Sequence, residues 1–218
     1  QIEQEMAVIV ANGGRFFVWD TPTPQSGLTP ERFEFMGRVV APFLRARQPW
    51  CLGFDRVADV SLLHSVAAHY AVNDKSAPSF HRPNNRIDGA AAALTKLHLN
   101  YEMLPDWRLH QDDARGRLLI VEHPKVLTER TVESLIRFVS DGGSLLITGM
   151  GLSRSEELRK VFGIAKVDGS SSSEPLSFKS ADGEIPFGHW LGRVTPSTAT
   201  VLLEVSDAEG RQYPLLTQ

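Results

Sequence analysis

The pattern of apolar and polar residues is most informative between Gly116 and Gly151. An apolar run, LLIVEHP, stops at a proline and predicts a buried strand, and a second run, SLLITG, predicts another. Between them, Thr128 suits the N-cap of a helix and the pair Gly142–Gly143 suits its end. The apolar positions of that helix recur at helical spacing: Val132, Leu135, Ile136 and Val139. The segment therefore predicts a strand–helix–strand unit, and such units form parallel sheets covered by helices.

The same kind of pattern extends over residues 57–165 and predicts an α/β domain. VADVSLLHS predicts a strand, and the polar segment VNDKSAPSFHRPNNR after it predicts an exposed loop. IDGAAAALTKLHL predicts a helix, and YEMLPD predicts a short second strand. Ser153 and Glu156 have the spacing of a capping box for a last helix, which Gly163 ends. The predicted order is β-α-β-β-α-β-α, with the helix after the second strand missing or replaced by a loop.

The first stretch, residues 1–50, has a different pattern. The apolar runs VIV and FFVW predict strands within MAVIVANGGRFFVWDTP. Thr29 and Pro30 then suit the start of a helix that reaches about Arg47. A strand region and one helix cannot bury both of their faces alone, so we expect residues 1–50 to pack against something larger.

The last stretch, residues 166–218, predicts a small β-rich region. DGSSSSEP is typical of a flexible link. Two hairpins follow, with turns at Asp182–Gly183 and near Ala208–Gly210. The expected domains are therefore 1–50, 57–165 and 166–218.

Composition and charge narrow the class of protein. The chain has 218 residues, 42% of them hydrophobic and 22% charged, which is ordinary for a globular protein. A net charge of −3 argues against a general nucleic-acid binder. No apolar run has membrane-spanning length, and no N-terminal signal pattern is visible, so we expect no membrane partner. The single cysteine, Cys51, excludes an internal disulfide, and we expect it to be a packing or linker residue.

Candidate chemistry lies mainly where predicted strands end. His64 closes one strand and Glu122 and His123 close another, and the carboxyl ends of parallel strands form the ligand crevice of such sheets. A Ser–His–acid arrangement can be drawn from these residues and Ser65. The alternative is that they bond to loop backbone, and no motif supports a nucleophile. His64 and His69 are five residues apart, which does not suit a zinc pair on one helix face, so we predict no metal site and no cofactor.

A second candidate site is Trp19–Asp20, at the end of FFVWD. An acid there can act in catalysis or bind sugar hydroxyls, and a tryptophan can stack on a sugar. The alternative is that Asp20 simply starts a turn at Thr21. The candidate ligand-binding residues are therefore Trp19, Asp20, His64, Glu122 and His123. The glycines of Gly142–Gly143 and of Gly149–Gly151 fit neither phosphate-loop pattern.

Three segments carry a resemblance to a known family: VADVSLLHS, AAAALTKLHLNYEMLPD and RLLIVEHPKVLTERTVESLIRFVSDGGSLLITG. They resemble the β-galactosidase trimerisation domain, a member of the class I glutamine amidotransferase-like superfamily. The resemblance implies a fold class: α/β, with a flavodoxin-like three-layer parallel sheet and a small β-rich C-terminal region. Active amidotransferases carry a cysteine at the strand–helix elbow, which falls near Glu122–His123 here. The resemblance therefore implies the fold without glutaminase activity.

Residues 7–50 are similar to the last strand and helix of the (β/α)8 barrel in glycoside hydrolases that carry this domain. That similarity implies that Trp19 and Asp20 lie at a barrel rim, with the catalytic carboxylates elsewhere. The predicted function is a non-catalytic accessory or oligomerisation domain of a carbohydrate-active enzyme, associating as a trimer or dimer. One alternative is a hydrolase or degenerate amidotransferase with a site around His64 and His123. The other is a sugar-binding module that uses Trp19, Trp107 or Trp190, with carbohydrate as its partner.

Overall fold

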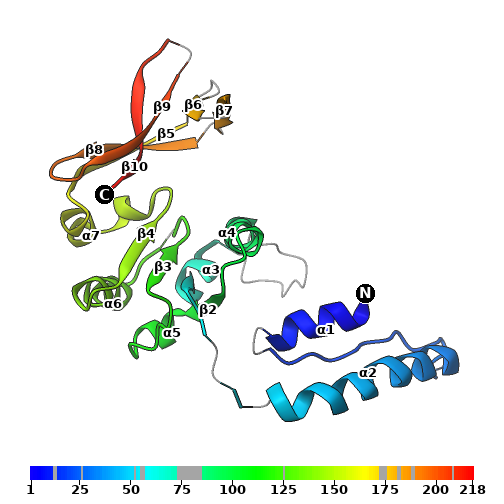
Figure 1. The fold of residues 1–218 in the computed structure, drawn as a ribbon. Coiled ribbons are helices and arrows are strands. Elements are labelled where there is room, and N and C mark those ends of the chain that lie inside the picture. The colour runs from blue at the N-terminus through cyan, green and yellow to red at the C-terminus, as the bar shows by residue number, and fades with distance from the viewer. Residues whose placement is uncertain are drawn as a thin grey trace. The chain divides into compact units, whose positions relative to one another are not determined.

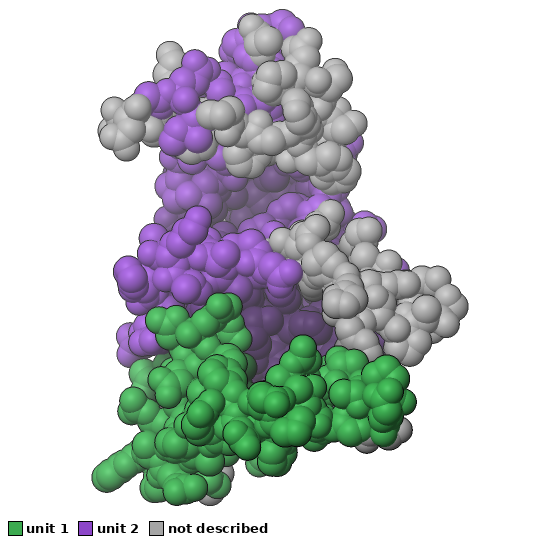
Figure 2. All heavy atoms as spheres, turned by 90° about the vertical axis from the view of Figure 1, so that its right-hand side faces the viewer, with its two compact units in different colours: residues 1–57 green, residues 58–218 purple. Residues whose placement is uncertain are grey.

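A computed structural model describes residues 1–11, 14–25, 27–51, 53–54, 57–72, 85–124, 126–171, 176–180, 183–187, 190–207 and 209–218. The chain divides into two compact units, residues 1–57 and residues 58–218 (Figure 2). We call them unit 1 and unit 2. Residues 166–218, which the sequence sets apart as a domain, lie in the same compact unit as residues 58–165.

The described residues of unit 1 form two helices, α1 (Ile2–Ala11) and α2 (Pro30–Cys51). The predicted strands are wrong: VIV lies inside α1, and FFVW has no regular structure. A short apolar run alone does not separate a strand from a helix, and glutamates in the first turn of α1 favour the helix. The helix predicted from Pro30 is confirmed, although it continues to Cys51 through two prolines.

Unit 1 has almost no core of its own. Met6 is the only buried side chain among its described residues, and α2 buries none of its residues. An edge-to-face contact between Phe16 and Phe43, with ring centroids 6.1 Å apart, joins the connecting segment to α2. Large apolar side chains of α2, among them Phe33 and Trp50, are exposed.

Unit 2 is built on a four-stranded parallel sheet in the order β2-β1-β3-β4 (Figure 1). The strands are β1 (Val60–His64), β2 (Tyr101–Pro105), β3 (Leu118–Val121) and β4 (Ser144–Ile147). All neighbouring pairs are parallel. All four were predicted from their apolar runs, so the α/β class with a parallel sheet is confirmed.

The helices of this domain depart from the predicted order in two places. They are α3 (Val66–Val72), α4 (Asn85–Lys96), α5 (Asp106–Leu109), α6 (Glu129–Ser140), η1 (Gly151–Arg154) and α7 (Glu156–Val161). The sequence pattern missed α3, and the short helix α5 occupies the predicted gap between β2 and β3. The predicted loop of residues 72–86 lies mostly outside the described residues.

The helix caps confirm one prediction and correct another. Thr128 caps α6, because its hydroxyl accepts a hydrogen bond from Thr131 N at 3.2 Å. The predicted cap of α7, Ser153, is wrong, since Ser153 lies in η1. Ser155 caps α7 instead and accepts from Leu158 N at 3.2 Å. As predicted, α6 ends just before Gly142, which has a φ of 93°, a conformation that suits glycine.

Helices cover both faces of the parallel sheet. On one face, Leu62 and Ile120 pack against Leu94 of α4. On the other face, Leu119 and Val121 pack against helix α6, and the same core continues into α7 and Ile164. The sheet is therefore the middle layer of three, and its strand ends are the places where polar side chains can gather.

The C-terminal region is β-rich, as predicted. Strand β5 (Ile164–Ser171) pairs with β8 (Trp190–Pro196), and a four-stranded antiparallel sheet has the order β10-β9-β6-β7. Its strands are β6 (Leu176–Ser180), β7 (Gly183–Phe187), β9 (Val201–Ser206) and β10 (Gln212–Thr217). The two predicted hairpins, β6–β7 and β9–β10, are confirmed.

The predicted flexible link of residues 168–175 is wrong in its first half. Residues 168–171 pair with β8, so they belong to β5; residues 172–175 lie outside the described part of the chain. The guanidinium of Arg193 lies 4.7 Å from the ring centroid of Tyr213, which joins β8 to β10.

Candidate functional site

The backbone that follows β1 is held by the carboxylate of Asp106, the residue directly after β2. Asp106 is buried, and its Oδ2 accepts hydrogen bonds from Val66 N at 3.0 Å and Ala67 N at 3.5 Å. Ser65 Oγ accepts from Ala68 N at 3.2 Å and donates to Asp106 at 3.4 Å. Ser65 and Asp106 therefore cap α3. Among the described residues, the structure gives Ser65 no histidine partner of the kind that a nucleophile needs.

His64 ends β1 beside this cap, and its ring lies 5.5 Å from that of His69. Burial lowers the pKa of His64 below its ordinary value, and His69 lowers it further, while Asp106 opposes both effects. Burial thus favours the neutral form of the His64 imidazole.

Glu122 and His123 follow β3, and the structure brings them together on Thr148, which follows β4. Thr148 Oγ1 donates to Glu122 Oε2 at 2.6 Å and accepts from His123 N at 3.0 Å. His123 has a φ of 36°, in the left-handed region that is costly for a side chain larger than glycine. The strand–helix turn is thus held in an uncommon conformation at the elbow that the resemblance indicated.

The other two candidates, Trp19 and Asp20, belong to unit 1. Trp19 is 76% exposed. Asp20 Oδ1 accepts from Thr21 N at 2.9 Å and pairs with Arg32 at 3.1 Å. Residues 21–23 form no turn, and the turn of this segment lies at Pro24 and Gln25, so Asp20 bonds to its neighbour in the chain and to Arg32 without starting the turn that the sequence offered as the alternative.

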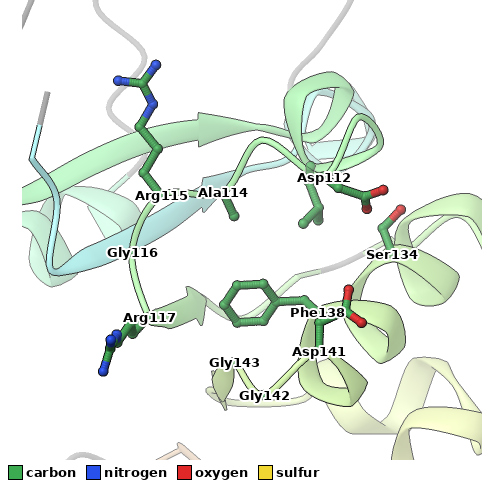
Figure 3. A pocket seen from close by; sticks show the side chains of 11 residues that line it. Asp112, Ala114, Arg115, Gly116, Arg117, Ser134, Phe138, Asp141, Gly142 and Gly143 are labelled. Carbon is green, nitrogen blue, oxygen red and sulfur yellow. The ribbon is translucent and has the colours of Figure 1, made fainter. Parts of the chain in front are cut away.

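A cavity of about 480 Å³ opens at the opposite, amino edge of the parallel sheet. Figure 3 shows the ring of Phe138 in its middle, with Arg115 and Arg117 on one side and Asp112 and Asp141 on the other. It is lined by Leu109, Asp112, Ala114, Arg115, Gly116, Arg117, Ser134, Phe138, Asp141, Gly142 and Gly143. The sequence did not predict this cavity, because its lining comes from the loop before β3, helix α6 and the turn before β4, which only the fold brings together.

One wall of the cavity is fixed by a buried carboxylate. Glu102 is 1% exposed, and its Oε1 accepts from Arg115 N at 2.8 Å and from Ser61 Oγ at 2.8 Å. Ser61 Oγ in turn accepts from Gly116 N at 3.0 Å. Arg108 pairs with Glu102 Oε2 at 3.1 Å, which compensates the buried negative charge.

Arg108 also donates to Asp113 Oδ2 at 2.7 Å. The hydrogen bond with Asp113 raises the pKa of Arg108, against the opposing effect of burial, and the charge of Glu102 adds to the rise. The same hydrogen bond lowers the pKa of Asp113. Both groups are therefore charged throughout the physiological pH range, and the segment leading into β3 is held by a satisfied ionic network.

The opposite wall is held by a second ion pair. Arg137 Nη1 donates to Asp112 at 2.8 Å and 3.0 Å. The ring of Phe138 lies over Gly143, where an added Cβ would be 2.3 Å from Cε1 of the ring. Glycine at position 143 therefore allows the ring to lie where it does.

Other classes of site find no support in the described part of the chain. No group of three or more His, Cys, Asp or Glu residues there has the arrangement to hold a metal ion. None of the described helices is both long and apolar enough to span a membrane. Cys51 is a half-buried free thiol at the end of α2.

Together, these features define the class of domain: an α/β domain on a four-stranded parallel sheet, extended by antiparallel sheets. Solved glycoside hydrolases share this fold. The α-L-fucosidase isoenzyme 2 from Paenibacillus thiaminolyticus matches with a TM-score of 0.70 and 20% identity, over 94% of this chain and 31% of that chain. The GH42 β-galactosidase Gan42B from G. stearothermophilus matches with a TM-score of 0.68 and 16% identity, over 90% and 30%.

A β-galactosidase from Bacillus circulans sp. alkalophilus also matches, with a TM-score of 0.62 and 21% identity, over 83% of this chain and 30% of that chain. The chain thus spans less than a third of the length of these enzymes. No protein-family model and no curated protein sequence matches it. The resemblance to a domain of glycoside hydrolases is confirmed, and at these identities it is a likeness of fold.

Proposed function

We propose that this chain is a non-catalytic accessory or oligomerisation domain of a glycoside hydrolase. One observation carries the proposal: the fucosidase matches nearly all of this chain, whereas the match covers only 31% of the fucosidase. A domain of this kind supplies a packing surface to a larger enzyme, while the glycosidic bond is cleaved by carboxylates of another domain.

The finer fold assignment is a flavodoxin-like, class I glutamine amidotransferase-like sheet. The order β2-β1-β3-β4 supports it, because the first four strands of flavodoxin-like sheets have this order. His123, with its positive φ, occupies the elbow after β3, where an active amidotransferase has its cysteine. Thr148 already engages Glu122 and the backbone of His123, which favours a structural role for the elbow.

For unit 1 we propose the end of a (β/α)8 barrel, with the three-part division at residues 1–50, 57–165 and 166–218. The exposed side chains of α2 support this, because Phe33 is 64% and Trp50 82% exposed. A 22-residue helix that buries none of its residues gains little stability from packing. The rest of a barrel would cover that apolar surface.

The proposed partner is a further copy of the same protein, in a trimer or a dimer. Exposed apolar side chains on the β9–β10 hairpin, Leu202 at 53% and Leu216 at 41%, support a role in association. The test is the solution mass of the chain by light scattering over a hundredfold dilution series. A dilution-insensitive trimer or dimer is the expected result, and a monomer at every concentration would overturn the oligomerisation role. The double variant Leu202→Glu, Leu216→Glu should dissociate the oligomer, and Phe33→Glu in unit 1 is its control.

A sugar-binding module is the second candidate. Trp19 and Trp107, at 76% and 56% exposure, are both accessible as stacking platforms, which favours this candidate. The hydrolase alternative around His64 and His123 has less support, because the Ser65 hydroxyl caps α3. Loss of saccharide binding on changing Trp107→Ala or Trp19→Ala is the result that this candidate requires.

A further inference from the structure

Helix α3 is attached to the carboxyl edge of the parallel sheet with little burial. It has 7 residues, and none of its described side chains is buried. Val66 is 38% and Tyr70 58% exposed. Isolated helices shorter than about 12–15 residues are marginal in water, so α3 depends on its few contacts with the rest of the domain.

The first turn of α3 is held by hydrogen bonds. Asp106 Oδ2 accepts from Val66 N at 3.0 Å, and Ser65 Oγ accepts from Ala68 N at 3.2 Å. A carboxylate at the start of a helix also suits the helix dipole. The first turn therefore has an anchor that does not involve a histidine.

Further along α3, a pair of histidines forms a second contact with the sheet. The ring of His69 lies 5.5 Å from that of His64, the last residue of β1, with 33° between the ring planes. Both residues are half-buried. Histidine side chains ordinarily change charge between about pH 5 and 8, so this contact can pass from neutral to doubly charged in that range.

The surrounding elements bring the following side chains to the histidine pair: Tyr70 of α3, Pro105 of β2, Asp106 of α5 and Glu122 after β3. Asp106 favours a charged His64, but its carboxylate is also bound by the backbone of α3. Glu122 reaches the same edge as His64, since each lies two residues beyond the register pair Leu62–Ile120, and its carboxylate accepts a hydrogen bond from a threonine.

Protonation of the pair opposes the docked position of α3. Burial lowers the pKa of His64 below its ordinary value of 6.5, His69 lowers it further, and the opposing effect of Asp106 is smaller. The docked state therefore binds fewer protons than a state in which α3 has moved away. Docking is thus fully favoured above about pH 6.5 and weakens as the pH falls below this value. The 5.5 Å between the rings is shorter than the Debye length of roughly 8 Å at physiological ionic strength, so salt screens the repulsion only in part.

We propose that protonation of His64 and His69 releases the last turn of α3, residues 69–72, from the carboxyl edge of the sheet, while Asp106 keeps the first turn in place. Release exposes the ring of His64 to solvent. The device lies within unit 2 and is independent of the accessory role and of oligomerisation.

The test is amide hydrogen exchange of the whole chain, resolved by residue with NMR, at pH values between about 8 and about 5. The protection factors are corrected for the intrinsic effect of pH on exchange. We expect the protection of residues 69–72 to fall severalfold towards the acid end, while that of β3 stays constant. A titration of the histidine ring signals should place the pKa of His64 below 6.5.

Two substitutions at position 69 separate charge from structure. His69→Lys places a permanent positive charge beside His64, so it should reduce the protection of residues 69–72 at about pH 8, although lysine is the better helix former. His69→Asn, with a helix propensity close to that of histidine, should remove most of the pH dependence. His98→Asn is the matched control, because His98 is exposed in the turn between α4 and β2. It should keep the pH dependence of the wild type.

Any of the following results would overturn the proposal. One is a protection of residues 69–72 that stays constant over the whole pH range. Another is an equal fall in β3, which would mean that acid unfolds the entire domain. A fall that His69→Asn leaves unchanged would show that the histidine pair is not its cause, and so would a fully protected α3 in His69→Lys.

Discussion

Units 1 and 2 differ in how their apolar residues are used. In unit 2, Leu62, Leu104 and Leu119 are completely buried between sheet and helices. In unit 1, Met6 is the one buried side chain among the described residues, while Phe33 and Trp50 are exposed. Both units have ordinary helices, so secondary structure alone does not separate them. Unit 2 therefore has the buried apolar surface that independent stability requires, and the described residues of unit 1 bury too little to match it.

The largest expected difference is in hydrogen exchange. Amides of β1 and β3 should exchange only through global unfolding, whereas those of α2 should exchange through local opening. We expect protection in the two elements to differ by several orders of magnitude, measured by exchange and mass spectrometry on the isolated chain. Equal protection in α2 and β3 would break the comparison.

The next largest effect concerns two carboxylates that both pair with an arginine and a backbone N–H. Glu102→Ala removes the acceptor of Ser61 Oγ and of Arg115 N, and it removes one of the two carboxylates that bind Arg108. It should cost about 3–5 kcal/mol in the free energy of unfolding. Asp20→Ala breaks a pair whose arginine is 65% exposed, and should cost about 0–1 kcal/mol. Urea unfolding followed by circular dichroism measures both, and similar losses would contradict the difference in burial.

Apolar truncations sharpen the same comparison. Leu119→Ala removes a fully buried side chain and should cost about 2–5 kcal/mol. Phe33→Ala, at a position that is 64% exposed, should change stability by less than about 0.5 kcal/mol. The same unfolding experiment provides the measurement. A large loss for Phe33→Ala in the isolated chain would show that α2 has packing that its exposure does not reveal.

A smaller effect tests the corrected helix cap inside unit 2. Ser155→Ala removes the acceptor for Leu158 N and should cost about 1 kcal/mol. Ser153→Ala is the control, because the hydroxyl of Ser153 donates to Met150 O and caps no helix. Thermal unfolding of the two variants should show a lower Tm for Ser155→Ala alone. A lower Tm for Ser153→Ala alone would instead support Ser153 as the cap of α7, as the sequence predicted.

The smallest effect is the pH dependence of the β9–β10 turn. Burial opposes ionisation of Asp207, but hydrogen bonds from Arg211 and Tyr213 outweigh it and lower its pKa to about 2. Because this pKa is depressed, its contribution to stability is complete above the unfolded value of about 3.9 and is lost as pH falls through about 2. The difference in the free energy of unfolding between wild type and Asp207→Asn should therefore narrow as the pH falls from about 4 to about 2, measured by urea unfolding at each pH. Asp168→Asn, which removes one partner of an exposed ion pair with Lys166, is the control variant.

The sequence predicted what depends on local pattern. The strands around Leu119 and Leu145, the helix between them and its Thr128 cap follow from residues close together in the chain. The failure at VIV has the same cause, because three apolar residues fit a helix as well as a strand. Ser153 and Ser155 both fit a cap, and only the backbone geometry separates them.

The candidate sites depended on contacts that sequence does not reveal. Asp106 caps α3 from 40 residues away along the chain, so the role of Ser65 at a helix start could not be read locally. The cavity around Phe138 combines the loop before β3 with the turn before β4. Phe138 follows the helical pattern of α6, and nothing in that pattern distinguishes a core ring from one that lines an opening.

The central position of β1 has a consequence for the order of folding. Its hydrogen-bonding neighbours β2 and β3 both come later in the chain, and Ser61 bonds to residues 41 and 55 positions away. During synthesis, β1 is therefore made before both of the strands with which it pairs, and its apolar residues stay unpaired until those strands have been synthesised. Long-range parallel pairing of this kind is slow, because the loop entropy is lost before the contacts form. The nascent chain is thus most prone to aggregation in the interval between the appearance of β1 and that of β3.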